Sequence, residues 1–158
     1  IGKENFDNSL KKYFNDWSFR HPKPNDFIRS AEKVSGLELD WYLLDWTQST
    51  MTIDYSINSV YGVDNKTKVV LKRIGQMGMP IDVRVFLNSG DYLDYNIPMT
   101  KMRGSKPLNE STLLDSWSWA KPYYEFWIDI DSKNISKILI DPKNEMADVN
   151  RANNSLYL

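Results

Sequence analysis

The first third of the chain carries large apolar residues at helical spacing. They recur after four, three, one and three positions, which places them on one stripe of an α-helix: Phe6, Leu10, Tyr13, Phe14 and Trp17. A stripe of this kind needs a partner surface. The segment His21-Pro22-Lys23-Pro24 then ends the helix, because proline lacks a backbone N–H and moves the residue before it out of the α region.

Two further helices are expected before residue 50. The second begins near Asn25 and has four apolar residues on one side, namely Phe27, Ile28, Ala31 and Val34. Ser35 and Gly36 supply a left-handed stop at its C-terminal end. A third, short helix is predicted over residues 37–46.

The period changes near Thr50, where apolar and polar residues begin to alternate as they do in strands buried on one face. Strands are predicted at residues 53–58, 68–74, 81–87, 92–97, 123–130 and 135–140. Six or seven short strands favour a two-layered antiparallel sandwich, because two layers are needed to bury that many apolar faces. Residues 101–122 are expected to form a long connection, and the polar tail begins at residue 144.

The predicted fold class is therefore α+β. A helical segment of about three helices, residues 1–49, precedes an antiparallel, immunoglobulin-like β-sandwich, residues 50–158. At 41% hydrophobic and 13% aromatic content the chain can bury a sizeable core.

Charge and composition restrict the classes of molecule that this chain is expected to bind. The net charge of −1 arises from interspersed acidic and basic residues, so no field attracts nucleic acid or a membrane surface. No apolar run approaches the roughly 20 residues of a membrane helix. The chain has no cysteine, which is compatible with both the cytoplasm and the bacterial periplasm. It begins at Ile1 without an initiator methionine, which fits a cut or processed product.

Few residues are candidates for catalysis or metal binding. His21 is the only histidine, and one imidazole between prolines forms neither a zinc site nor a triad without several partners. Carboxylate pairs such as Glu38 with Asp40, or Asp40 with Asp45, are expected by chance in a chain with 21 acidic residues. We therefore expect structural or solvated roles for them.

Two other clusters of residues have both a structural and a functional interpretation. Asp129, Asp131 and Asn134 have the spacing of calcium ligands but lack the glycine and the bidentate glutamate of a calcium loop, so a solvated hairpin turn is favoured. Five aromatic residues gather between Trp117 and Trp127. They are Trp117, Trp119, Tyr123, Tyr124 and Trp127, and they predict either a packed interior, an interface or a sugar-stacking platform.

The order of particular residues is more specific than composition or periodicity. In the helical segment the motif comprises Trp17, Phe19, His21, Pro22, Pro24, Asp26, Phe27, Glu32, Ser35, Gly36, Leu39, Asp40, Trp41 and Trp46. It resembles the end of the catalytic domain of aminopeptidase N-like zinc metallopeptidases, which are gluzincins. Downstream, Gly78-Met79-Pro80, Ile140-Asp141-Pro142, Ala147-Asp148-Val149-Asn150 and Asn153-Asn154 resemble the β-sandwich that ends the bacterial members. Together these segments cover nearly the whole chain.

The resemblance implies a parent enzyme that removes N-terminal residues from peptides. Its zinc would be held by a His-Glu-x-x-His helix and a more distant glutamate. The zinc would polarise the peptide carbonyl and lower the pKa of its water, and the glutamate of the motif would take the proton. With one histidine this motif cannot be written in the present sequence, and the Gly-x-Met-Glu-Asn segment that binds the substrate amine is also missing. No catalytic, cofactor-binding or metal-binding residue is carried over.

We therefore expect a non-catalytic C-terminal portion that braces an upstream catalytic domain of the same polypeptide. The zinc and the peptide substrates belong to the parent, for which an extracytoplasmic compartment such as the periplasm is slightly favoured. Two alternatives stay open: a carbohydrate- or peptide-binding sandwich that uses the aromatics from Trp117 to Trp127, and an assembly module that dimerises through its N-terminal helices.

Overall fold

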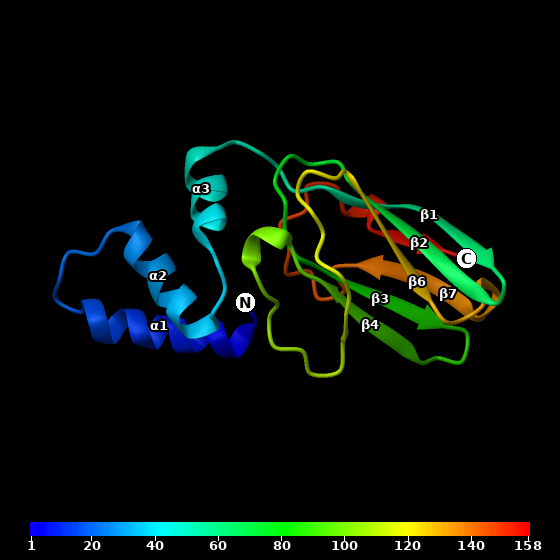
Figure 1. The fold of residues 1–158 in the computed structure, drawn as a ribbon, viewed down its shortest axis with the longest axis horizontal. Coiled ribbons are helices and arrows are strands. Elements are labelled where there is room, and N and C mark those ends of the chain that lie inside the picture. The colour runs from blue at the N-terminus through cyan, green and yellow to red at the C-terminus, as the bar shows by residue number, and fades with distance from the viewer. The chain divides into compact units, whose positions relative to one another are not determined.

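The computed structural model describes residues 1–158 and divides the chain into two compact units. The helical unit comprises Ile1–Met51 and Met99–Pro107, and the β unit comprises Thr52–Pro98 and Leu108–Leu158. Figure 1 follows the elements of both units along the chain. The predicted α+β class is confirmed. The first crossing between the units lies close to the predicted boundary after residue 49, whereas the return of residues 99–107 to the helical unit is absent from the prediction.

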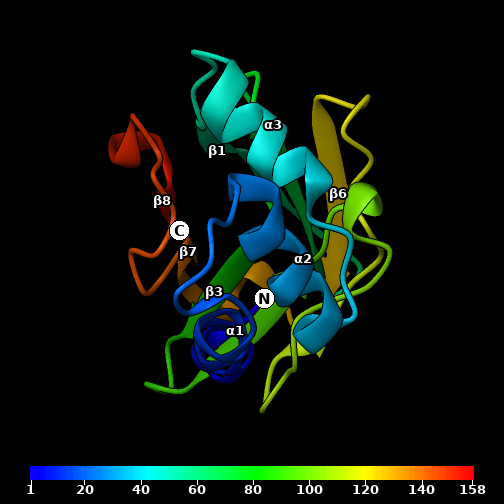
Figure 2. The same ribbon diagram turned by 90° about the vertical axis from the view of Figure 1, so that its left-hand side faces the viewer.

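Three helices make up most of the helical unit. Helix α1 spans Lys3–Trp17, α2 spans Pro24–Ser35 and α3 spans Asp40–Gln48. Helix α1 packs against α2, and Figure 2 shows α1 nearly end-on beside it. Ser9 is completely buried in α1, and its hydroxyl donates to the Asn5 carbonyl at 2.6 Å. A small side chain at this position lets the helices approach closely.

A segment from the middle of the chain completes the helical unit. It contains a short 3₁₀ helix, η1, at Thr100–Met102, and both Met99 and Met102 are buried. The Glu38 N–H donates to the Met102 carbonyl at 3.0 Å, so the segment is bonded to the turn before α3. The segment thus adds two buried methionines to the helical unit.

Eight strands form the two sheets of the β unit. The first sheet has the order β1-β2-β6, with β1 at Tyr55–Val63, β2 at Lys66–Arg73 and β6 at Tyr123–Ile128. The second has the order β5-β4-β3-β7-β8, with β3 at Ile81–Leu87, β4 at Tyr92–Ile97, β5 at Thr112–Leu113, β7 at Ile135–Ile140 and β8 at Ser155–Tyr157. The six predicted strands correspond to β1, β2, β3, β4, β6 and β7.

Two features of the β unit differ from the prediction. The short pair β4–β5 is parallel, whereas all other strand pairs are antiparallel. Strand β8 lies in the tail that was predicted to be merely polar. The immunoglobulin-like form of the sandwich stays a prediction.

The core of the β unit lies between the inner faces of its two sheets. Val69 and Leu71 of β2 are fully buried, as are Val83 and Val85 of β3, at the alternate positions that a strand directs to one face. The rings of Tyr95 in β4 and Phe126 in β6 lie 5.4 Å apart, which joins the two sheets. Burial of each large apolar side chain contributes about 1.5–3 kcal/mol.

Gly75 lies where the end of β2 passes the entrance to β1. The N–H groups of Ile74 and Gly75 both donate to the Asp54 carbonyl, at 2.8 and 2.9 Å. A Cβ atom at Gly75 would lie 2.3 Å from the Thr52 oxygen and 2.5 Å from the Asp54 nitrogen. Both are backbone atoms, and moving either of them would distort hydrogen bonds or a peptide plane.

Replacement of Gly75 by alanine is therefore expected to lower the free energy of unfolding by about 1–3 kcal/mol, the usual cost of overpacking. Urea unfolding followed by tryptophan fluorescence measures the change. The control is Lys143→Ala, at an exposed position, where a change within about 0.5 kcal/mol is expected. Equal midpoints for Gly75→Ala and the wild-type chain would contradict the close approach.

Candidate functional site

Part of the motif that resembles the peptidase family builds the start of α2. Pro24 is the first residue of the helix, where its missing N–H costs nothing. The Asp26 carboxylate accepts a hydrogen bond from the Lys23 N–H at 2.7 Å, which is the carboxylate half of a capping box and satisfies the backbone of the N-cap residue. The Phe27 ring meets Tyr13 of α1 edge-on, with centroids 5.3 Å apart. These three motif residues are thus explained by helix initiation and packing.

Three other motif residues fix the turn between α2 and α3. The Glu32 carboxylate accepts from the Leu39 N–H at 2.8 Å. Gly36 has φ 71° and caps α2 in the left-handed conformation, which confirms the predicted stop. Trp41 is buried, and its indole N–H donates to the Glu38 carbonyl at 2.8 Å. One hydrogen bond to the Glu32 side chain of α2 and one from the Trp41 side chain of α3 therefore hold the turn.

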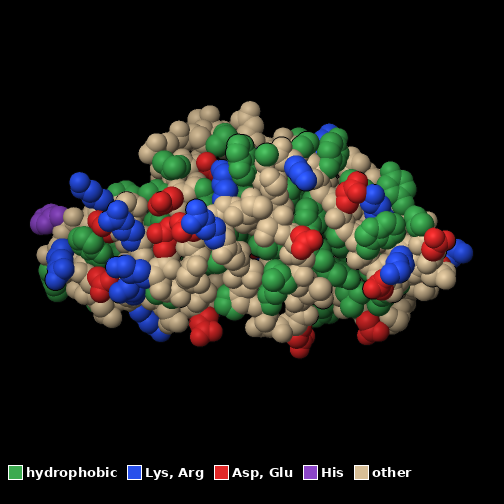
Figure 3. Space-filling view, in the orientation of Figure 1, with side chains coloured by type: hydrophobic (Ala, Val, Ile, Leu, Met, Phe, Trp, Pro, Cys, Tyr) green, Lys and Arg blue, Asp and Glu red, His purple; other side chains and the backbone are tan.

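Four other motif residues lie wholly or partly at the surface of the helical unit. His21 and Pro22 are exposed, Trp17 is half-buried, and Trp46 is 44% exposed. Figure 3, in which the only histidine is purple, shows its side chain standing out at the surface. These positions are therefore candidates for contact with something outside the chain.

Phe19 is the most unusual of these surface residues. It lies in the turn after α1 with φ 62°, in the left-handed region that bulky residues rarely adopt. Its side chain is fully exposed, at 105% of the reference area. A phenyl ring that is fully exposed on a strained backbone does not stabilise the helical unit. Such a ring indicates a contact with another domain or molecule.

Helix α1 also presents an apolar face to solvent. Phe6, Leu10 and Phe14 follow each other at intervals of four residues and are 46%, 43% and 69% exposed. The predicted stripe is therefore divided, because Tyr13 packs on α2 while these three point away from the core. On another side of α1, Lys12 bonds to Asp16 at 2.9 Å, and this hydrogen bond lowers the pKa of the Asp16 carboxyl.

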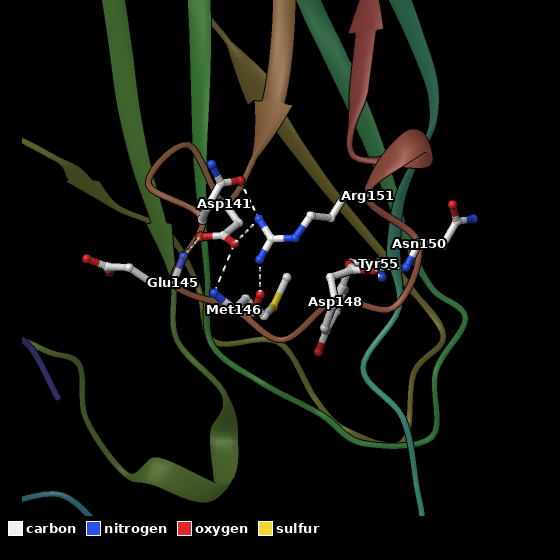
Figure 4. A network of polar contacts seen from close by, with 8 residues as sticks. Tyr55, Asp141, Glu145, Met146, Asp148, Asn150 and Arg151 are labelled. Atoms are coloured by element: carbon white, nitrogen blue, oxygen red, sulfur yellow. Dashed lines mark hydrogen bonds and ion pairs between the residues drawn. The ribbon is translucent and has the colours of Figure 1, made fainter.

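The C-terminal part of the motif forms a polar clasp around the entrance to β1 (Figure 4). Asp148 is buried, and its carboxylate accepts from the N–H groups of Tyr55 at 3.0 Å and Asn150 at 2.8 Å. The Val149 N–H donates to the Ile53 carbonyl at 3.0 Å. The entrance to β1 is thereby bonded to a segment more than ninety residues further along the chain.

Two asparagines extend this clasp. The Asn153 amide donates to the Asp54 carboxylate at 2.8 Å. Asn154 is buried, and with its amide oriented to donate, its nitrogen reaches the Tyr55 carbonyl at 2.6 Å. Both asparagines belong to the motif that resembles the family, so this part of the resemblance is accounted for by a structural network.

Asp141 organises the adjoining loop (Figure 4). Its two carboxylate oxygens accept from the N–H groups of Glu145 and Met146, each at 2.9 Å. Arg151 lies 3.7 Å from the same carboxylate and donates to the Met146 carbonyl at 2.6 Å. Because these bonds join residues 141–151 to one another, the network positions this segment of the chain.

Tyr55 connects the clasp to the interior. Its hydroxyl accepts from the Met79 N–H at 2.8 Å and donates to the Met79 carbonyl at 3.1 Å. Burial raises the pKa of Tyr55 to about 12. The ring also meets Trp117 edge-on, with centroids 5.4 Å apart. Met79 lies in the Gly-Met-Pro segment of the resemblance, and the two bonds hold the backbone of that segment.

The titratable residues considered for chemistry lie apart. No group of three or more His, Asp or Glu side chains is placed to hold a metal ion. Asp129 pairs with Lys66 at 2.6 Å, and Asp131 caps a short 3₁₀ helix by accepting from the Lys133 N–H at 3.0 Å. The turn that contains Asp131 joins β6 to β7 in different sheets, so the predicted hairpin is wrong there.

The aromatic concentration from Trp117 to Trp127 is divided between the core and the surface. Trp117 is 5% exposed and stacks near Tyr124, with centroids 5.2 Å apart. Trp119, Tyr123 and Trp127 are each about half exposed. The cluster is therefore partly in the interior and partly at the surface. Within β6, the alternation of the strand places Tyr123 and Trp127 on the outer face.

Compared with protein-family models and with curated proteins, the chain matches none of them. In the structure, no helix has the length and apolar character needed to cross a membrane. The resemblance to aminopeptidase N-like enzymes consequently rests on the motif residues alone.

Removal of the Asp148 carboxylate tests the clasp. The change Asp148→Ala leaves the buried Tyr55 N–H without an acceptor, and we expect the free energy of unfolding to fall by about 1–3 kcal/mol. Urea unfolding monitored by circular dichroism measures it. The matched control is Asp129→Ala, which removes a carboxylate from an exposed ion pair worth about 0–1 kcal/mol. Equal losses from the two variants would refute the role assigned to Asp148.

Proposed function

We propose that this chain is the non-catalytic C-terminal portion of an aminopeptidase N-like zinc metallopeptidase. In this proposal it braces an upstream catalytic domain of the same polypeptide. The zinc, the catalytic residues and the peptide substrate belong to that domain, and the present chain supplies none of their ligands.

The observation that carries this proposal is the apolar surface of the helical unit. Phe6, Leu10 and Phe14 form one exposed face of α1, and the turn that follows exposes Phe19. Large apolar side chains exposed together on one helix face are typical of an interaction site in a folded protein. The surface lies within the segment whose motif resembles the end of a catalytic domain, so a missing part of that domain is the occupant that fits both observations.

The division of the motif supports the same conclusion. Pro24, Asp26, Glu32, Gly36 and Trp41 serve the internal structure of the helical unit. The motif residues left over, among them Trp17, His21 and Trp46, lie wholly or partly at its surface. In a complete catalytic domain such residues would pack against neighbouring helices, and each large apolar side chain buried there would contribute about 1.5–3 kcal/mol.

A second candidate is favoured by the same apolar face. If no upstream domain exists, two copies of the chain would pair through α1, and the chain would be an assembly module. Sedimentation at increasing concentration separates the two candidates, because only the assembly module requires the isolated chain to dimerise.

The first test compares this chain with the complete translation product of its gene. We expect the complete product to contain zinc and to hydrolyse an aminoacyl fluorogenic amide, and the chain by itself to do neither. Elemental analysis and a fluorescence assay measure both properties. Zinc-dependent peptidase activity in the chain itself, or a complete product with no additional domain, would overturn the proposal.

The second test uses Phe14→Ser. In the isolated chain the ring is largely exposed, so the change should alter the free energy of unfolding by no more than about 0.5 kcal/mol. In the complete product the same change should destabilise by about 2 kcal/mol or more, because a buried ring is lost.

Lys11→Ser is the matched control on the polar side of α1, where no effect is expected in either protein. Calorimetric melting temperatures of all six samples give the comparison. An equally small effect of Phe14→Ser in both proteins would show that α1 does not contact the upstream domain.

A further inference from the structure

The outer face of the β1-β2-β6 sheet carries aromatic residues on both sides of a row of lysines. Strand β2 directs Lys66, Lys68 and Lys72 outward, since the alternate residues Val69 and Leu71 are buried. On the neighbouring strands Tyr61, Tyr123 and Trp127 are 53%, 47% and 50% exposed. These six residues are called the lysine–aromatic face below.

The strand register brings these side chains into rows. Tyr61 of β1 is opposite Lys68 of β2, which in turn is opposite Trp127 of β6. Lys72 is opposite Tyr123 in a second row. Because Tyr61 and Trp127 are two strand spacings apart, their backbones are separated by about 10 Å. Such a separation gives each aromatic ring room for its own stacking partner.

The charges on this face are only partly compensated. Lys66 pairs with Asp129 and Lys68 with Glu125, each at 2.6 Å. Lys72 has no ion pair, and its ammonium lies 5.7 Å from the centroid of the Tyr123 ring. The face therefore presents one spare positive charge beside an exposed aromatic ring, which complements a ligand that combines an apolar ring face with a negative charge.

We propose that the lysine–aromatic face binds an extended oligosaccharide that contains uronic acid residues. The apolar C–H face of a sugar ring stacks on an aromatic ring, and Tyr61 and Trp127 would each hold one sugar. The hydroxyl groups of the sugars meet the Lys68–Glu125 pair, which offers both donors and an acceptor. A uronate carboxylate meets Lys72.

The outer face of the other sheet makes a useful contrast. There the Arg84 guanidinium lies 3.9 Å from the centroid of the Tyr92 ring and is held by two hydrogen bonds to Asp94, both 2.7 Å. The guanidinium thus occupies the ring face that a sugar would need. On the lysine–aromatic face the ammonium groups lie farther from the rings, at 5.7 and 5.9 Å.

Isothermal titration calorimetry on the full chain tests the proposal with a short oligomer of galacturonic acid. Two comparison ligands are a neutral oligomer of glucose and an oligopeptide of glutamate. We expect measurable binding of the uronate oligomer, and at least about tenfold weaker binding of the other two. No binding of the uronate, or equal binding of either comparison ligand, would overturn the proposal.

Three variants locate the site. Trp127→Ala is expected to weaken uronate binding by about tenfold, and Lys72→Gln is expected to weaken binding and reduce its dependence on salt. Tyr157→Ala is the control, because Tyr157 is an exposed tyrosine whose ring lies 4.8 Å from the Lys137 ammonium on the other sheet. Circular dichroism checks that each variant is folded. Unchanged affinity in Trp127→Ala, or equal loss in Tyr157→Ala, would contradict the assignment.

Discussion

The β unit depends on the bonds that Asp148 makes at the entrance to β1. Tyr55 begins that strand, and its amide group has the buried carboxylate of Asp148 as its acceptor. Its carbonyl is served by Asn154. Without these bonds two buried polar groups of the backbone would be left unpaired, which is costly in an apolar interior. Asp148 and Asn154, near the end of the chain, are thus needed to hold β1 in place.

This dependence also explains why the prediction for the C-terminal tail was incomplete. The tail after residue 144 is polar, and polar residues outside a periodic pattern are typical of loops. In the structure two of those polar residues, Asp148 and Asn154, are buried and bond to the backbone of β1. Their partners lie about one hundred positions earlier in the chain, and no local pattern reveals a pairing at that distance.

The elements with a clear period were predictable. The stripe of α1, the stop at Gly36 and the six alternating strands all depend on short-range physics. Strand β5 has only two residues, too few for a period, and residues 99–107 have no regular spacing that would assign them to the helices. Their placement is decided by the burial of Met99 and Met102, which is a property of the tertiary structure.

The candidate sites were predictable to a smaller extent. The motif in residues 17–46 marked the correct segment but did not separate the residues that cap and pack, such as Asp26 and Trp41, from those left at the surface, such as Trp46. The aromatics near Trp127 were noted, whereas Tyr61 and Lys72 were not, because only the strand register brings them onto the same face. Phe19 was part of the motif, but its left-handed backbone and its complete exposure are visible only in the structure.

The return of residues 99–107 to the helical unit has a consequence for how this protein can change during evolution. The chain passes between the two units three times, after residues 51, 98 and 107. A recombination event that transferred only the first 51 residues to another gene would leave Met99 and Met102 behind and open the transferred core to water. Neither unit is therefore a module that shuffling can move alone, and the two are expected to be inherited together.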